Sequence, residues 1–79
     1  MAAQRNNARR FQIGDVVRLR AGSRISTSYD VKVDEVGTVT WVEKHPPETG
    51  PTYRMEVKFS RVELPRIFEF EYELVKAAS

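Results

Sequence analysis

The side chains that could do covalent or metal chemistry are few in this sequence. It contains no cysteine, which excludes disulfides, thiolate metal sites and cysteine nucleophiles. Its one histidine, His45, excludes a two-histidine metal site within one chain. Glu69, Glu71 and Glu73 alternate along the chain, and we interpret this run as solvent-facing glutamates along one strand edge rather than as hydrolytic carboxylates. We therefore expect no catalytic residue, no metal ligand and no cofactor-binding residue.

The cationic side chains are more informative, because charge is distributed unevenly. Residues 1–24 carry six arginines against one acid, giving +5, whereas residues 25–62 carry −1 and residues 63–79 carry −2. The candidate partner-binding residues are Arg18, Arg20, Trp41, Arg54, Lys58 and Arg61. The basic ones are expected on outer strand faces and in the turn after the third strand. A basic patch attracts acidic partners and raises association rates more than affinity. The alternative is an ordinary solvated face, because Asp15 and Glu56 interrupt the run.

Short strands must position these side chains, and two of them show clear alternation. Residues 16–20 form the first strand, with Val17 and Leu19 pointing inward, and a turn at Gly14 precedes it. Residues 53–59 alternate apolar with charged side chains, which is typical of a half-buried antiparallel strand.

The strand between these two is predicted over residues 36–42, which are rich in β-branched and aromatic types. Gly37 within it indicates a bulge or a close backbone approach. Alternation places Val39 and Trp41 on the same face as Gly37. Trp41 is then either a core or loop-packing residue or a binding aromatic.

The remaining segments are loops and shorter elements. We expect a loop over residues 21–35, with a short strand at 29–33, and a proline-rich loop over residues 45–52. Toward the C-terminus we expect a connection, a fourth strand, a single 3₁₀ turn and a last strand, at residues 60–65, 66–69, 70–72 and 73–76. No amphipathic helix is predicted.

The 79 residues are enough for one domain. We expect a flexible basic arm at residues 1–10, a barrel at 11–76 and a frayed tail at 77–79. The fold class is all-β: a small five-stranded, partly open SH3-like barrel, since closure limits exposed strand edges. We expect no membrane span and no secretory signal, and therefore a cytoplasmic domain.

The order of these segments resembles a known superfamily. The relevant stretches are FQIGDVVRLR, DEVGTVTWV, YRMEVKFSRVEL and FEYELV, which together cover about Phe11 to Lys76. They are similar to the SH3-like barrels of electron-transport accessory proteins, including the β chain of nitrile hydratase, the small stromal accessory chain of photosystem I and the variable chain of ferredoxin–thioredoxin reductase. The resemblance implies a barrel that has no catalytic role and docks on a metal- or cofactor-bearing subunit.

Three functions follow from these observations. The first is an accessory protein-interaction module that docks on an acidic surface or an enzyme subunit. The alternative is a nucleic-acid-binding barrel of the KOW or Tudor type, which would use the basic arm, Arg18 and Arg20. A third is a small oligomeric enzyme with Tyr53, His45 or carboxylates gathered at a symmetry axis. The first is preferred because catalytic groups are scarce and most of the chain is net acidic, which weakens a continuous positive track.

Overall fold

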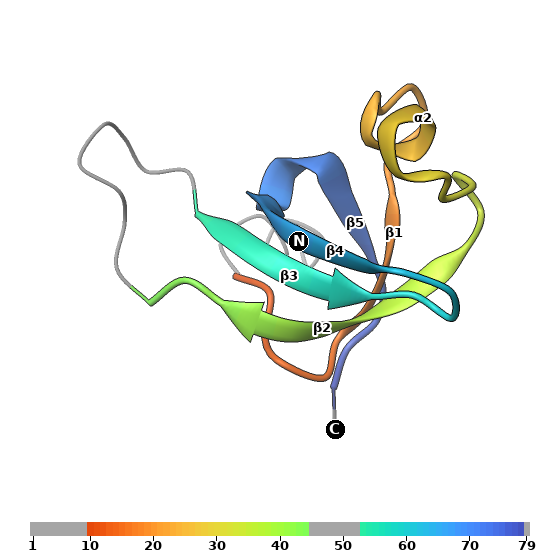
Figure 1. Ribbon diagram of the computed structural model, residues 1–79. Helices are drawn as coiled ribbons and strands as arrows, with labels where there is room; N and C mark the ends of the chain where they lie inside the picture. The colour runs from red at the N-terminus through yellow and green to blue at the C-terminus, as the bar shows by residue number, and fades with distance from the viewer. Residues whose placement is uncertain (1–9, 45–52, 79) are drawn as a thin grey trace, which may run out of the picture.

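Alternating apolar residues build five antiparallel strands, which a computed structural model describes over residues 10–44 and 53–78 (Figure 1). In chain order the elements are β1 (Val16–Leu19), α2 (Ile25–Tyr29), β2 (Val36–Val42), β3 (Arg54–Lys58), β4 (Glu63–Phe68), the 3₁₀ turn η2 (Glu69–Glu71) and β5 (Tyr72–Lys76). The strand order is β4-β3-β2-β1-β5, with no pairing between the two outer strands in this part of the chain. The all-β class and the single 3₁₀ turn before the last strand are therefore confirmed, and the partly open sheet is consistent with an SH3-like barrel.

The core lies on the inner face of the curved sheet. The buried hydrophobic residues are Val17, Leu19, Val31, Val39, Met55, Val57, Phe59, Leu64 and Tyr72. The inward positions predicted for the first and third strands are confirmed. Each such side chain contributes roughly 1.5–3 kcal/mol when it leaves water, so this set is the main source of stability.

A bulge in β2 changes the direction of its last residues. Val39 lies opposite Val57, but two residues later Trp41 lies opposite Glu56, so Thr40 is one extra residue in the ladder. Directly opposite residues share a face, and Trp41 therefore lies on the outer face. The valine after it packs against the core instead. The predicted shared face of Val39 and Trp41 is wrong, because the bulge resets the period of two.

Gly37 allows β2 to approach β3 closely. A Cβ atom at this buried position would lie 2.8 Å from Val57 Cγ1 and 2.9 Å from the carbonyl oxygen of Lys58. Both distances are shorter than real Cβ contacts. The close backbone approach predicted at Gly37 is confirmed.

The segment between β1 and β2 differs from the prediction, since it contains α2 and no strand at residues 29–33. Local side-chain bonds start this short helix: the Ile25 N–H donates to Ser23 Oγ at 3.2 Å, and Ser26 Oγ–H donates to the Ser23 carbonyl at 3.0 Å. The helix ends at Asp30, which has a left-handed φ of 58°. Five residues are too few to show a helical hydrophobic period.

β4 begins earlier than predicted and includes Pro65, for which the sequence predicts a connection. Met55 lies opposite Ile67, whereas Val57 lies opposite Leu64, so β4 carries one extra residue here. β4 is also an outer strand of the sheet. A proline is tolerated at such a position because the ladder does not need its missing N–H.

Asp15 joins the two ends of the barrel. Its carboxylate is fully buried and accepts the Gln12 N–H at Oδ2 and the Ala78 N–H at Oδ1, both at 2.8 Å. The turn predicted at Gly14 is confirmed, with a φ of 99°. The carboxylate therefore fixes the start of β1 to the residues that follow β5.

Several predictions lie outside the described residues. These are the arm before Arg10, the proline-rich loop 45–52 with His45, and Ser79. Within residues 10–44 and 53–78, no helix has the length and apolar character that a membrane crossing requires.

Candidate interaction surface

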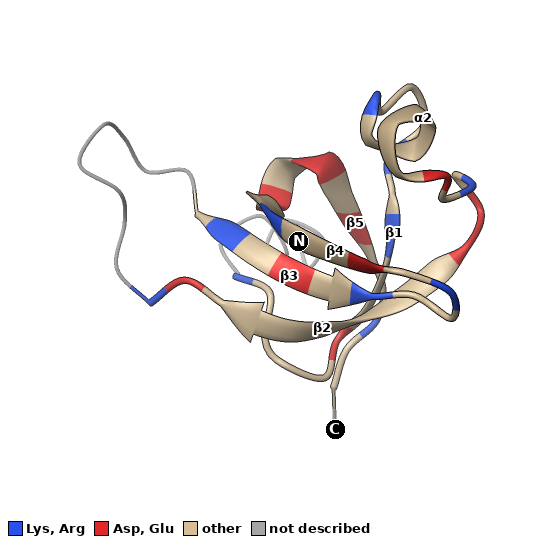
Figure 2. Ribbon diagram, viewed as in Figure 1, with Lys and Arg blue, Asp and Glu red and all other residues tan. Residues whose placement is uncertain are grey.

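The six candidate partner-binding residues do not form one continuous basic patch. β2 lies between β1 and β3, so Arg18 is a neighbour of Val36, while Lys58 is a neighbour of Thr38. Basic and acidic residues alternate along β3 in Figure 2, whereas β2 carries no charged residue. The outer surface is thus a mosaic of charge.

Most of the arginines in the described part of the chain form ion pairs with its own carboxylates. The ion pairs join Arg10 to Glu69 at 3.9 Å, Arg18 to Glu73 at 2.6 Å, Arg54 to Glu43 at 2.9 Å, Arg61 to Asp30 at 3.6 Å and Arg66 to Glu56 at 3.2 Å. Exposed pairs of this kind contribute only about 0–1 kcal/mol each to stability. Their main effect is to cancel the positive potential that these arginines would otherwise present.

The pair of Arg54 and Glu43 is the most elaborate of these contacts. The Arg54 backbone N–H, Nε and Nη2 all donate to the Glu43 carboxylate, at 3.0, 3.3 and 2.9 Å. The side-chain hydrogen bond from Arg54 lowers the pKa of Glu43, and the same bond raises the pKa of Arg54. Arg54 is therefore committed to its own chain.

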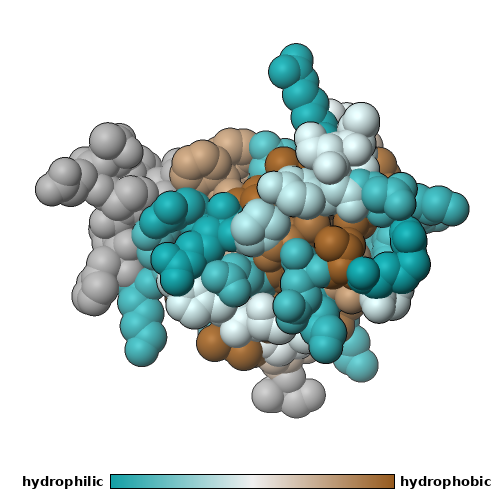
Figure 3. Space-filling view, in the orientation of Figure 1, coloured by the Kyte–Doolittle hydropathy of each residue, from teal (hydrophilic) through white to brown (hydrophobic). Residues whose placement is uncertain are grey.

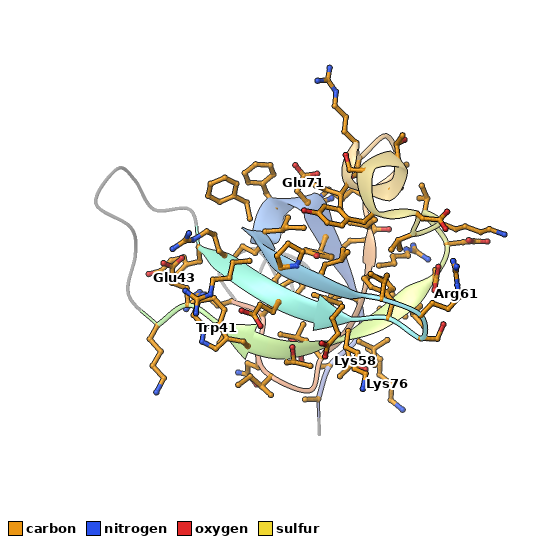
Figure 4. All side chains as sticks on the ribbon, viewed as in Figure 1. Trp41, Glu43, Lys58, Arg61, Glu71 and Lys76 are labelled. Carbon is orange, nitrogen blue, oxygen red and sulfur yellow. The ribbon has the colours of Figure 1, made fainter. Side chains whose placement is uncertain are left out.

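Trp41 is also covered by its own chain. It lies half-buried on the outer face, and the Arg66 guanidinium carbon is 4.2 Å from the centre of its ring (Figure 4). Arg66 Nε also donates to Glu56 at 3.2 Å. The cation and its carboxylate hold the indole as a surface-packing residue.

Arg20 and Arg61 are tied to backbone carbonyl groups. Arg20 Nε donates to the Phe70 carbonyl at 2.8 Å, and no carboxylate lies within ion-pair distance of Arg20 in the described part of the chain. Arg61 Nη2 donates to the Asp30 carbonyl at 3.2 Å, which links the β3–β4 turn to the end of α2. Arg20 thus keeps most of its donors available.

Lys58 differs from the arginines, and Lys76 shares its environment. The ladder aligns Lys76 with Val16, Val16 with Thr38 and Thr38 with Lys58, which makes one row across four strands. Both lysines are exposed, and neither has an ion pair among residues 10–44 and 53–78. Figure 4 shows the two lysines on the same side of the molecule. We call these four residues the lysine row; its two ends are roughly 14 Å apart along the sheet at about 4.8 Å per strand.

Lys58 also has an acidic neighbour. Glu63 lies directly opposite it in β4, but no ion pair joins their side chains. The far end of the row at Lys76 has Val16 as its ladder neighbour. The row is therefore the part of the sheet where cations stay unmatched.

The sequence analysis missed an exposed aromatic pair, Phe68 and Phe70. Their rings stack with centroids 5.5 Å apart and planes at 10°, and the residues are 43% and 55% exposed. We call this pair the aromatic shelf. An alternating strand would place both residues on one face with the buried Tyr72, but η2 turns the chain between them and exposes them. The signal that could have located them is two phenylalanines two residues apart, one before the predicted 3₁₀ turn and one within it.

The three glutamates near η2 do not share one strand edge. Glu69 and Glu71 belong to η2, and only Glu73 belongs to β5. Burial raises the pKa of Glu69, although Arg10 and the Phe11 backbone N–H act against this. The interpretation of the run as one solvent-facing edge is wrong, because the 3₁₀ turn interrupts the strand.

Tyr72 carries one of the buried polar atoms that lack a hydrogen-bond partner within the described residues, together with Nε and Nη2 of Arg10. The Tyr72 hydroxyl has no hydrogen-bond partner in the described part of the chain, and burial raises its pKa, with further contributions from Glu71 and Tyr29. Across residues 10–44 and 53–78, no group of three or more His, Cys, Asp or Glu side chains is placed to hold a metal ion.

None of the protein families, curated sequences or solved structures compared with the chain matches it. The functional argument therefore depends on the geometry of these surfaces.

Proposed function

We propose that the chain is a non-catalytic protein-interaction module that docks through the lysine row onto an acidic protein surface. One observation carries this proposal: Lys58 and Lys76 lack carboxylate partners in the described part of the chain, whereas Arg18, Arg54 and Arg61 have them. A partner carboxylate that approaches the row gains an interaction without breaking an existing ion pair. These three arginines offer no such gain.

The residues between the lysines suit a protein interface. Thr38 is exposed and Val16 is half-buried, and both lie on a regular ladder. Their short β-branched side chains present a surface that loses little entropy when it is covered. The lysines at the two ends would then set orientation and association rate.

The partner class follows from the resemblance described above. We propose an SH3-like accessory barrel of the electron-transport or nitrile hydratase β type, with a subunit of an oxidoreductase or metalloenzyme as its partner. The five-stranded open sheet agrees with this fold. The nucleic-acid-binding alternative is less favoured, since pairing of the arginines removes much of the continuous positive track that phosphate binding needs.

The test is a quantitative capture from native lysate with three forms of the full chain: wild type, Lys58→Glu/Lys76→Glu, and Lys32→Glu/Lys44→Glu. The last pair makes the same charge change at exposed lysines outside the row. We expect a discrete protein partner that the wild type and the control retain and the row variant loses. A partner retained equally by all three forms would contradict the proposal.

A parallel titration with RNA and DNA at low salt addresses the alternative. Tight binding at low salt that Lys58→Glu/Lys76→Glu abolishes would assign the row to nucleic acid and overturn the protein-docking proposal. We expect no such binding by residues of the row.

A further inference from the structure

We infer that the aromatic shelf is a second docking site, which takes an apolar side chain of a protein partner together with an adjacent carboxylate. The site is separate from the lysine row. Phe68 lies opposite Arg54 at the beginning of β3, whereas Lys58 is at its end. These two ends of the strand are roughly 13 Å apart at about 3.3 Å per residue. Figure 1 shows β3 running between them.

The exposed rings supply the apolar part of the site. Phe68 and Phe70 have wholly apolar side chains, yet about half of each residue is exposed to water. Figure 3 shows hydrophobic side chains that reach the surface between hydrophilic ones. Clustered exposed aromatic residues are typical of the buried centre of protein interfaces.

The backbone beneath the rings is held at several points. The Glu69 N–H donates to the Tyr53 carbonyl at 2.9 Å, and the Arg20 N–H donates to the Glu71 carbonyl at 2.9 Å. Arg20 Nε adds the bond to the Phe70 carbonyl at 2.8 Å. The shelf is therefore preorganised, and a partner need not order it.

The charges around the shelf indicate what accompanies the apolar side chain. Glu71 accepts the Ser23 hydroxyl at 2.8 Å, and Glu69 lies 3.9 Å from the Arg10 guanidinium. Arg20 uses one donor on a carbonyl and has no carboxylate partner among residues 10–44 and 53–78. Neither Arg20 nor Glu71 has an ion-pair partner in the described part of the chain. Because Arg20 uses only Nε on its own chain, its remaining guanidinium donors can bind a carboxylate of the partner through charge-assisted hydrogen bonds.

The neighbouring strand edges do not favour binding by strand addition. Pro65 removes one donor from β4. In β5 the register shifts between Val16 opposite Lys76 and Val17 opposite Leu74, so Val75 forms a bulge. Both features disfavour pairing of another strand with these edges. A partner would therefore bind the shelf through its side chains.

The test is a selection of short random peptides displayed on phage, panned on the full chain and on its Phe68→Ser/Phe70→Ser variant. We expect the wild type alone to enrich peptides with a large apolar residue next to Asp or Glu. A synthetic peptide of that sequence should bind the serine variant about tenfold more weakly or worse. Arg20→Gln should weaken it about threefold or more, and Lys58→Glu/Lys76→Glu should leave it unchanged.

Equal enrichment on both proteins, or peptides that lack the apolar and acidic pair, would overturn the inference. Phe70→Leu is the control for misfolding, since it keeps apolar area and should retain most peptide binding.

Two other occupants of the shelf would be detected by separate measurements. A wild-type dimer in sedimentation that the serine variant dissociates would assign the shelf to a second copy. A thymidine oligonucleotide that binds only wild type would assign it to nucleic-acid bases. Either result would overturn the inference, whereas loss of peptide binding in Lys58→Glu/Lys76→Glu would place the site on the row.

Discussion

The lysine row and the aromatic shelf lie at opposite ends of β3 and are built in different ways. The row follows ladder pairs across β5, β1, β2 and β3, with a bulge at Val75 beside its Lys76 end. The shelf lies where β4 ends and η2 begins, and hydrogen bonds with Tyr53 and Arg20 hold it. Strand pairing thus sets where the two lysines align, whereas the end of a strand at a 3₁₀ turn exposes the apolar side chains of the shelf. Perturbations of each region should therefore have different signatures.

The greatest loss of stability should follow removal of the Asp15 carboxylate, which links the start of β1 to the residues after β5. Asp15→Ala leaves the Gln12 and Ala78 N–H groups without their acceptor. Bonds to a charged group contribute about 1.5–3 kcal/mol each, so we expect a loss of about 3 kcal/mol in the free energy of unfolding. Urea titration measures it. Asp15→Asn keeps one acceptor and should lose less stability. An Asp15→Ala variant as stable as wild type would show that this carboxylate does not hold the two ends together.

The next effect concerns the close approach of β2 and β3. Gly37→Ala places a methyl group against Val57 and the Lys58 backbone, and overpacking of this kind costs about 1–3 kcal/mol. Thermal unfolding should show that Gly37→Ala is less stable than wild type by about this amount. A variant as stable as wild type would mean that the two strands can separate at little cost.

Some features of the fold can be predicted from the sequence and others cannot. The turn at Gly14 and the tight approach at Gly37 are predictable, because glycine marks both in an otherwise β-branched context. The inward residues of β1 and β3 follow from alternation. The pairing of Arg18 with Glu73 is not predictable from the sequence, since it depends on β1 and β5 being neighbours.

Other features could not be predicted from the sequence, because a single extra residue or a short turn interrupts the alternation of a strand. The bulge at Thr40 moves Trp41 to the outer face, and nothing in the composition of the strand marks it. The short α2 has no room for a helical period, and its Ser-rich sequence is typical of a loop. η2 is predicted one residue too late, which hides the exposure of Phe68. Of the two lysines in the row, the sequence analysis names Lys58 but not Lys76, because their alignment depends on β1 and β5 being neighbours.

A smaller effect tests the core beside the shelf. Tyr72→Phe removes a buried hydroxyl that has no partner in the described part of the chain, and we expect a gain of about 1 kcal/mol in the free energy of unfolding at neutral pH. The folded-state pKa of Tyr72 is raised above its value of about 10 in the unfolded chain. Because the folded protein keeps the Tyr72 hydroxyl protonated to a higher pH, folding does not depend on the ionisation of this group below about pH 10. Above that pH the unfolded chain ionises first, and the free energy of unfolding falls.

Unfolding of wild type and Tyr72→Phe at neutral and strongly alkaline pH measures both parts of this prediction. Wild type should lose more stability at high pH than the Phe variant. An alkaline loss that persists unchanged in Tyr72→Phe would assign it to another group.

Substitution in the lysine row itself should change stability least. Lys58→Glu/Lys76→Glu alters exposed side chains without ion pairs in the described residues. Lys58→Glu also puts a second carboxylate opposite Glu63, so we expect a loss of no more than about 1 kcal/mol. A melting curve close to that of wild type would show that the row does not stabilise the fold. A large loss of stability would assign these lysines a structural role.

Docking through the lysine row is tested most directly by the association rate of the captured partner, measured against ionic strength for wild type and Lys58→Glu/Lys76→Glu. If unmatched lysines steer the encounter, the wild-type rate falls steeply with salt, by about tenfold or more. The row variant should associate slowly at low salt and show little further dependence. A variant that keeps the wild-type rate and the wild-type salt dependence would contradict the proposed function.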